Sequence, residues 1–169
     1  MAQTDASTYG FALDIAQAGQ LVDLGPKRVD SRAAEGDVGF GLGVIFGTDP
    51  EKQVEVPGAA DLAAGIFAGI AIFTHTQSQG FNKATTPSSV AAEYKDGDTV
   101  SVLREGRVYV STADQVALGD LAYVAADGAI TDDDDGTIGP IGRFQGATGA
   151  SGGLVALDVV REISAPAVT

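Results

Sequence analysis

The sequence contains no cysteine and no tryptophan, and it has one methionine, Met1, and one histidine, His75. Without cysteine the chain cannot form disulfides, thiolate nucleophiles or iron–sulfur sites, so packing alone must hold the fold. A zinc-type metal site would need further histidine or cysteine ligands, which the chain lacks. We therefore interpret His75 as a structural residue and expect no bound metal and no cofactor.

Positive charge is also scarce. Ten Lys and Arg residues stand against 23 Asp and Glu residues, which gives a formal net charge of −13. Such a surface repels nucleic-acid phosphates, and no long basic run offsets the repulsion, so we expect no direct nucleic-acid partner. The stretch from Lys27 to Arg32 is the exception, because it is locally basic.

No apolar run reaches the length that spans a membrane. The nearest candidate, Ala59–Phe73, contains one aspartate and two glycines, so we expect it to hold a buried strand. The first residues lack the basic and apolar regions of a secretory signal. We therefore expect a soluble protein that is made in the cytoplasm and has no membrane partner.

Glycine is abundant, with 23 residues, and alanine, valine and threonine are frequent. This composition favours short strands and tight turns over helices. We predict an all-β fold, a small barrel or sandwich of short antiparallel strands with little helix. The predicted strands are residues 40–46, 52–56, 66–74, 99–103, 107–111, 121–125, 129–131, 141–148 and 154–160, with a turn of helix at 61–64 and a loop at 77–89.

The N-terminal region has a different pattern. Tyr9, Phe11, Leu13 and Ile15 alternate with small or polar residues, which predicts a strand with one apolar face. The following stretch, 16–37, is rich in turn residues and predicts an extended, loose connection. We therefore divide the chain into an arm, residues 1–35, and a barrel domain, residues 36–169. The apolar strand either closes its own barrel or pairs with a sheet edge of another subunit, and the long connection favours the second.

A ten-residue pattern occurs twice, as GDTVSVLREG from Gly97 to Gly106 and as GDLAYVAADG from Gly119 to Gly128. In each copy Gly-Asp begins a turn into a strand, and the last glycine supplies the positive φ of a hairpin turn out of it. We predict two successive hairpins that form one wall of the barrel. Similar turns occur in biotinyl carrier and self-splicing domains, but the sequence lacks the modified lysine beside methionine and the histidine pair that those domains require.

Two glycine-containing stretches are weak candidates for ligand sites. GFGLGVIFG, residues 39–47, lacks the lysine of a phosphate-binding loop, so we expect a strand packed closely on a neighbour. TDDDDG, residues 131–136, places Gly142 where a calcium loop needs a glutamate. We interpret the run Asp132–Asp135 as a solvated hairpin tip, with a weak calcium site as the alternative.

Several segments follow one another in a recognisable order: AGQLVD, VDSR, the glycine-rich FGLGVIFG, the strand around Val54-Glu55-Val56, GIFAGIAI, and the Gly-Asp segments ending in LVALDVV. Over nearly the whole chain this order resembles the structural cement, or head decoration, proteins of tailed bacteriophages. The resemblance implies a small β-barrel with an N-terminal arm on the outer surface of the virion head. It also implies synthesis in the host cytoplasm, contact with the major capsid protein across capsomer boundaries, and a symmetric homo-oligomer, with a trimer favoured over a dimer.

These considerations together assign partner binding to the apolar face of the arm and to the basic stretch after it: Tyr9, Phe11, Leu13, Ile15, Lys27, Arg28 and Arg32. We expect no catalytic residue and no enzymatic activity. The main alternative is a virion-surface recognition module for carbohydrate or a host surface, which would need exposed aromatic residues on loops, where the sequence offers Phe81 and Tyr94. A hydrolase that uses carboxylates is a third hypothesis.

Overall fold

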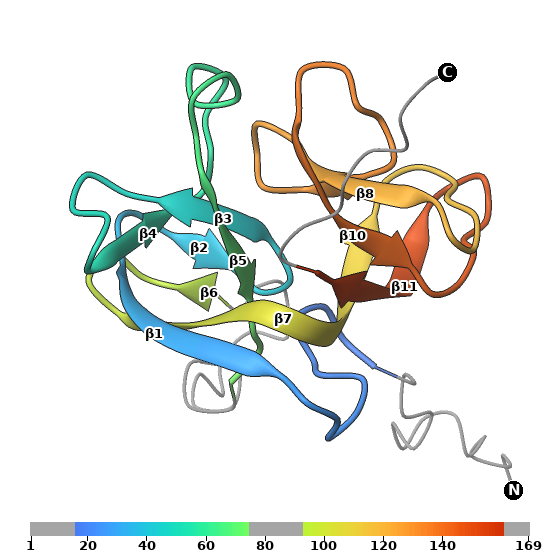
Figure 1. Cartoon of the computed structure of the whole chain (residues 1–169), viewed down its shortest axis with the longest axis horizontal. Helices are drawn as coiled ribbons and strands as arrows, with labels where there is room; N and C mark the ends of the chain where they lie inside the picture. Colours follow the sequence, from blue (N-terminus) through green and yellow to red (C-terminus); the bar gives the residue numbers. More distant parts are fainter. Residues whose placement is uncertain (1–15, 75–92, 161–169) are drawn as a thin grey trace, which may run out of the picture.

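The computed structural model describes residues 16–74 and 93–160. The predicted strand around Tyr9–Ile15, His75, and the predicted loop 77–89 lie outside the described residues. Within the two described ranges the chain forms β-strands and no α-helix, which confirms the all-β prediction (Figure 1). None of the residues in these ranges belongs to a helix that could cross a membrane.

The strands follow one another as β1 (Arg28–Ala34), β2 (Val38–Gly39), β3 (Gly43–Phe46), β4 (Gln53–Glu55), β5 (Phe67–Ala71), β6 (Glu93–Tyr94), β7 (Thr99–Thr112), β8 (Leu121–Val124), β9 (Ile130–Thr131), β10 (Ile138–Phe144) and β11 (Gly153–Val159). Most lie within or beside the predicted ranges. The predicted turn of helix at 61–64 is a set of hydrogen-bonded turns, in which the N–H of Gly65 donates to the carbonyl of Asp61.

Five strands close a small barrel. The main sheet runs β1-β4-β3-β5-β7 and then returns to β1, because β1 pairs with β4 on one side and with β7 on the other. The prediction of antiparallel strands holds for every described pair except β1–β4, which is parallel. The ring has five strands and its other four pairs are antiparallel, so β1 and β4 must run in the same direction.

β7 joins the barrel to the rest of the fold. Its first half pairs with β1 and β5, and from Gly106 onward it pairs with β11, beyond which the sheet continues through β10 and β8 to β9. Figure 1 shows β7 running from beside β1 to beside β11. The hairpin predicted at residues 104–106 is therefore wrong. Val100 and Val102 before this point and Val108 and Val110 after it are buried at alternate positions. Between them the buried Leu103 and the charged Arg104 and Glu105 interrupt the alternation, so the local sequence is also compatible with a turn.

The hairpin predicted around Gly128 is confirmed. β8 and β9 pair antiparallel, with Tyr123 opposite Thr131, and Gly128 has a φ of +76° in the turn between them. Only this copy of the repeated pattern makes a hairpin. The acidic run Asp132–Asp135 is exposed, as predicted, but it is a loop rather than a hairpin tip, because β9 and β10 both pair with β8 and not with each other.

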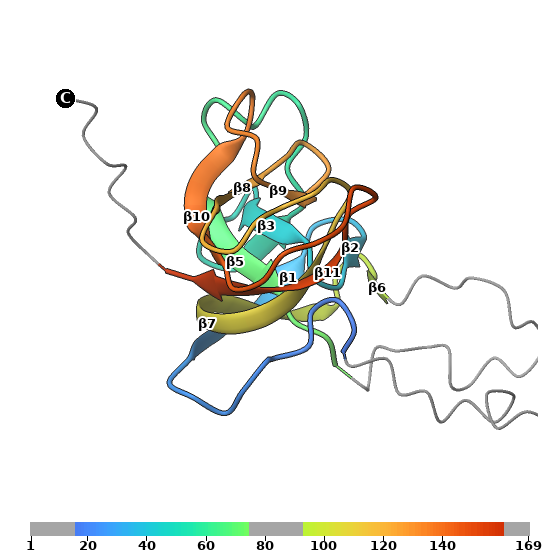
Figure 2. The ribbon, with the colours of Figure 1, turned by 90° about the vertical axis from the view of Figure 1, so that its right-hand side faces the viewer.

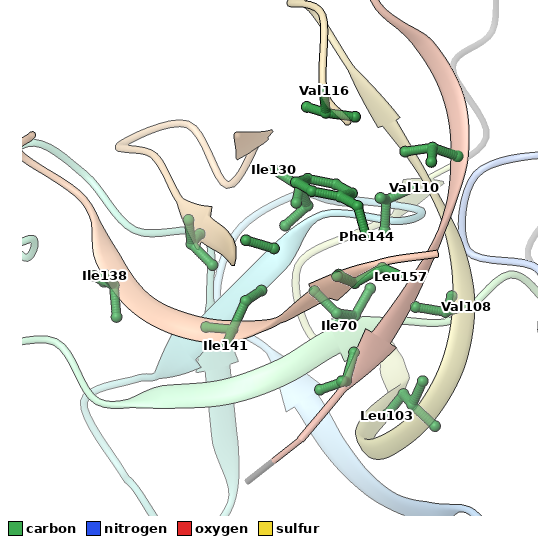
Figure 3. Close-up of a cluster of buried hydrophobic side chains, with 14 of the residues drawn as sticks. Ile70, Leu103, Val108, Val110, Val116, Ile130, Ile138, Ile141, Phe144 and Leu157 are labelled. Atoms are coloured by element: carbon green, nitrogen blue, oxygen red, sulfur yellow. The ribbon is translucent and has the colours of Figure 1, made fainter. Parts of the chain in front are cut away.

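The core has two clusters. The larger one includes Ile70, Leu103, Phe144 and Leu157 and lies where β5, β7, β10 and β11 meet (Figure 3). The smaller one fills the barrel between β1, β3 and β7. The fold thus has two halves, the barrel and the strands β8 to β11. They approach closely at the predicted glycine-rich strand, since a Cβ on Gly43 in β3 would lie 2.6 Å from a methyl carbon of Val124 in β8. The close-packed strand predicted there is thus confirmed.

The stretch 16–37 is more ordered than the predicted loose connection. It contains β1, which is part of the barrel wall, and an isolated bridge between Leu21 and Val108. The sequence signal was weak because β1, RVDSRAA, carries little apolar alternation. Of the region assigned to the arm, residues 28–34 are therefore a strand of the sheet, and the arm hypothesis concerns the residues before Ala16.

Candidate partner-binding surface

The first described residues, 16–22, lie between the segment that follows β5 and the second half of β7. The N–H of Gly19 donates to the carbonyl of Tyr109 at 2.8 Å, and the carbonyl of Gly19 accepts from the N–H of Phe73 at 2.8 Å. The N–H of Tyr109 donates in turn to the carbonyl of Gln20. Ala16, at the start of this segment, is buried. Residues 16–22 are thus fixed to the fold, and they set the point from which residues 1–15 continue.

After Val22 the chain crosses β7 at Gly106 and begins β1 on the other side. Gly106 has a φ of +127°, and a Cβ on it would lie 3.0 Å from the Cβ of Lys27. Figure 2 shows this crossing loop, residues 23–27, extending below β7. The Asp23 carboxylate accepts a hydrogen bond from the N–H of Gly25 at 2.8 Å and pairs with Arg107 at 3.6 Å. The loop is therefore anchored to β7 although it extends away from the barrel.

Leu24, on this loop, is 93% exposed, more than any other large apolar residue that the structure describes. Val29, at the start of β1, is 40% exposed. Lys27 and Arg28 lie between them in the chain and are exposed as well. We call Leu24, Lys27, Arg28 and Val29 the basic corner. An anchored leucine in water beside two cations is a feature that the sequence patterns did not reveal.

The basic corner differs from the other basic residues in the described ranges. Lys52, Lys95, Arg104 and Arg107 form ion pairs with neighbouring carboxylates. The hydrogen bond and charge of Asp37 and Glu93 raise the pKa of Lys95, and the hydrogen bond from Lys95 lowers the pKa of Asp37. Among the described basic residues, only Lys27 and Arg28 have neither an ion pair nor a side-chain hydrogen bond to a described residue.

Arg32, the third basic residue assigned to partner binding, is held within the fold. Its guanidinium donates to the carbonyl of Pro50 at 2.8 Å and lies 4.8 Å from the ring centroid of Phe46. These contacts tie β1 to the turn between β3 and β4. The four apolar residues assigned to the arm, Tyr9, Phe11, Leu13 and Ile15, lie outside the described residues, so their role stays a prediction.

A cleft of about 360 Å³ opens at one end of the barrel, where Phe46 and Ile66 face Pro140 and Val160 from the other half. The half-buried pair of Arg104 and Asp30, 3.0 Å apart, lies beside it. The cleft has no constellation of nucleophile and base. No group of three or more His, Cys, Asp or Glu within residues 16–74 and 93–160 could hold a metal ion.

The sequence matches a known family over most of its length. Residues 5–160 match the family model of the structural cement protein (E217 gp24/Pam3 gp6). The chain belongs to this family. The resemblance in the order of its segments is thereby confirmed, and this cement protein has a structural role in the phage capsid. No curated protein matched its sequence.

One solved structure shares the fold. A chain of the capsid of the Myoviridae phage XM1 superimposes on the cement protein with a TM-score of 0.65 at 17% sequence identity, covering 94% of this chain and 97% of that chain. The base of the head fibre gp8.5 of bacteriophage phi29 gives a TM-score of 0.44 at 15% identity, covering 80% and 96%. At such identities the first likeness concerns the fold alone.

Proposed function

We propose that this cement protein binds the outer surface of a tailed-phage capsid and bridges neighbouring major capsid subunits through its basic corner. The observation that carries the assignment is that Lys27 and Arg28 have no ionic partner among the described residues, beside a leucine that is 93% exposed. Leu24 provides the apolar centre of the contact, and the two cations lie beside it in the chain. Two cations on a chain of net charge −13 suit an acidic patch on the capsid.

The role requires no catalysis. Weak contacts to several capsid subunits become strong when those subunits are held in register, because each further contact is then intramolecular. Binding only to the assembled shell stabilises that shell by mass action. A small barrel with an anchored contact loop can act in this way without any buried polar site.

The experiment is co-sedimentation of variants with undecorated shells. Leu24→Asp and the double variant Lys27→Glu/Arg28→Glu should each lower affinity for shells at least tenfold. Leu118→Asp is the matched control for the leucine, since Leu118 is 69% exposed in the other half. Lys52→Glu is the control for charge, since Lys52 is exposed and pairs only with Asp49. Equal loss from the controls, or no loss from the corner variants, would refute the assignment.

Bridging has a separate readout from binding. Shells with bound protein should rupture at a higher temperature than bare shells, and the difference should disappear with the Lys27→Glu/Arg28→Glu variant. A protein that binds each capsid subunit singly would decorate shells without raising the rupture temperature.

The alternative of a carbohydrate or host-surface recognition module receives no support from the described residues. Tyr94, one of the two aromatic residues considered for it, is fully buried, stacks edge-on against Phe40 and donates its hydroxyl to the carbonyl of Ile72 at 2.6 Å. The other, Phe81, lies outside the described residues.

A further inference from the structure

The outer edge of β1 lacks a partner strand among the described residues. Ala33 and Ala34 pair with β4, but from Arg28 to Arg32 the strand pairs only with β7. The N–H of Ala33 donates toward β4 and that of Ala34 donates toward β7. Because backbone groups alternate along a strand, the N–H and C=O groups of Val29 and Ser31 face away from β7, past the end of β4. This edge can accept another strand.

Residues 1–15 suit this edge in length and charge. They contain two aspartates, Asp5 and Asp14, and no Lys or Arg, whereas Lys27 and Arg28 lie at the start of the edge. The alternating residues Tyr9–Ile15 exceed the unpaired length of β1. Fifteen extended residues can span up to about 50 Å, which is enough to leave one barrel and reach another.

The same chain is poorly placed to fill its own edge. Residues 19–22 form backbone hydrogen bonds with Tyr109 and Arg107, whose backbone groups face the β5 side of β7. On the same side, the N–H of Phe73 donates to the carbonyl of Gly19. β1 pairs with β7 through the opposite set of backbone groups, at Val100 and Val102. β7 and β1 thus both separate Ala16 from the unpaired edge of its own barrel.

We infer that the N-terminal segment of one copy adds as a strand to the unpaired edge of β1 in a second copy. Main-chain hydrogen bonds to Val29 and Ser31 provide the pairing. The protein is then a homo-oligomer whose subunits exchange arms, before any contact with a capsid. The inference does not depend on capsid binding.

The absence of cysteine makes the exchange directly testable in the full chain. One batch of protein carries a single cysteine on the arm, at Phe11, Leu13 or Ile15, and a second batch carries Val29→Cys or Ser31→Cys. The two batches are mixed, dissociated, allowed to reassociate and then oxidised. For at least one arm position, a disulfide should join two chains into a covalent pair of twice 17.0 kDa. Leu118→Cys, exposed in the other half, is the matched control and should give no pair with the arm.

A second measurement uses variants without cysteine. The native chain should sediment as two or three times 17.0 kDa, and Phe11→Asp/Leu13→Asp should sediment as a monomer with an unchanged melting temperature. Ser31→Pro, which removes the outward N–H and also fixes φ at about −65°, should yield a monomer that stays folded, whereas Ser31→Thr should remain an oligomer. A monomeric native chain, or a cross-link that forms only when both cysteines are in one molecule, would overturn the inference. Oligomers that exchange arms but fail to bind shells would leave the inference standing and refute the proposed function.

Discussion

Gly19 and Gly41 are in contact where the N-terminal segment enters the fold. A Cβ on Gly41 would lie 2.9 Å from the backbone nitrogen of Gly19 and 2.8 Å from the Cβ of Ala18, and both glycines have positive φ, +81° and +76°. The N–H of Gly41 donates to the carbonyl of Ala71, so the contact also joins the end of β5. The glycines belong to AGQLVD and FGLGVIFG, the first and third segments of the order that resembles the cement family. Part of that order therefore reflects one packing contact.

Gly41→Ala should destabilise the fold by roughly 3 kcal/mol, since it adds a steric overlap to the strain of a left-handed backbone. Gly36→Ala is the matched control. Gly36 has a φ of +83°, but apart from its chain neighbours no atom lies within 4 Å of the position that a Cβ would occupy, so the substitution should cost only the strain, about 1 kcal/mol. Urea unfolding measures both, and equal costs would show that the contact with Ala18 and Gly19 relaxes freely.

Gly106→Val and Gly128→Val should each lower the free energy of unfolding by more than about 1 kcal/mol, for different reasons. At Gly128 valine would enter a hairpin turn and approach the carbonyl oxygen of Gly43, 2.9 Å from the Cβ position. At Gly106 it would collide with Lys27 at the crossing of the loop over β7. Lys27→Gly should therefore recover part of the loss at Gly106 and none at Gly128, as a double-mutant cycle would show.

These two glycines also show how far the sequence predicts the fold. Alternating apolar residues and turn glycines predicted most strands and the β8–β9 hairpin, because those signals are local. The identical glycine at position 106 marks a change of partner strand inside β7, and nothing local distinguishes the two uses. The buried Leu103 and the charged Arg104 and Glu105 interrupt the apolar alternation there, as the residues of a hairpin turn would.

The candidate site was predictable in part. The local excess of Lys27 and Arg28 was visible in the sequence, and the structure leaves both without an ionic partner among the described residues. That Arg32 instead bonds Pro50 follows from the β1–β4 pairing, which links residues far apart in the chain. The exposure of Leu24 depends on where the crossing loop lies in the fold, and a local pattern of apolar residues does not predict that position.

Glu55 gives a prediction about pH. Burial, and then repulsion from Glu35 and Asp61, raise the pKa of Glu55 above its ordinary 4.5 in the folded protein. The folded state then binds the proton more tightly than the unfolded state, so this residue makes stability fall as pH rises above 4.5 through the raised pKa. Glu55→Gln should raise the melting temperature at pH 7 and leave it nearly unchanged well below pH 4.5. A benefit that is equal at both pH values would contradict the assignment.

The protein should prefer assembled shells to free capsid subunits by at least a hundredfold in affinity, since several weak contacts act together only on the shell. Titration of labelled protein against shells and against unassembled capsid protein measures the ratio. Equal affinities would mean that a single capsid subunit contains the complete binding site.

Cryo-electron microscopy of decorated shells tests the bridging role most directly. We expect density for the barrel outside the shell, above boundaries between neighbouring capsid subunits, with Leu24, Lys27 and Arg28 facing the shell. Density that contacts only one capsid subunit, or that turns this corner toward solvent, would contradict it.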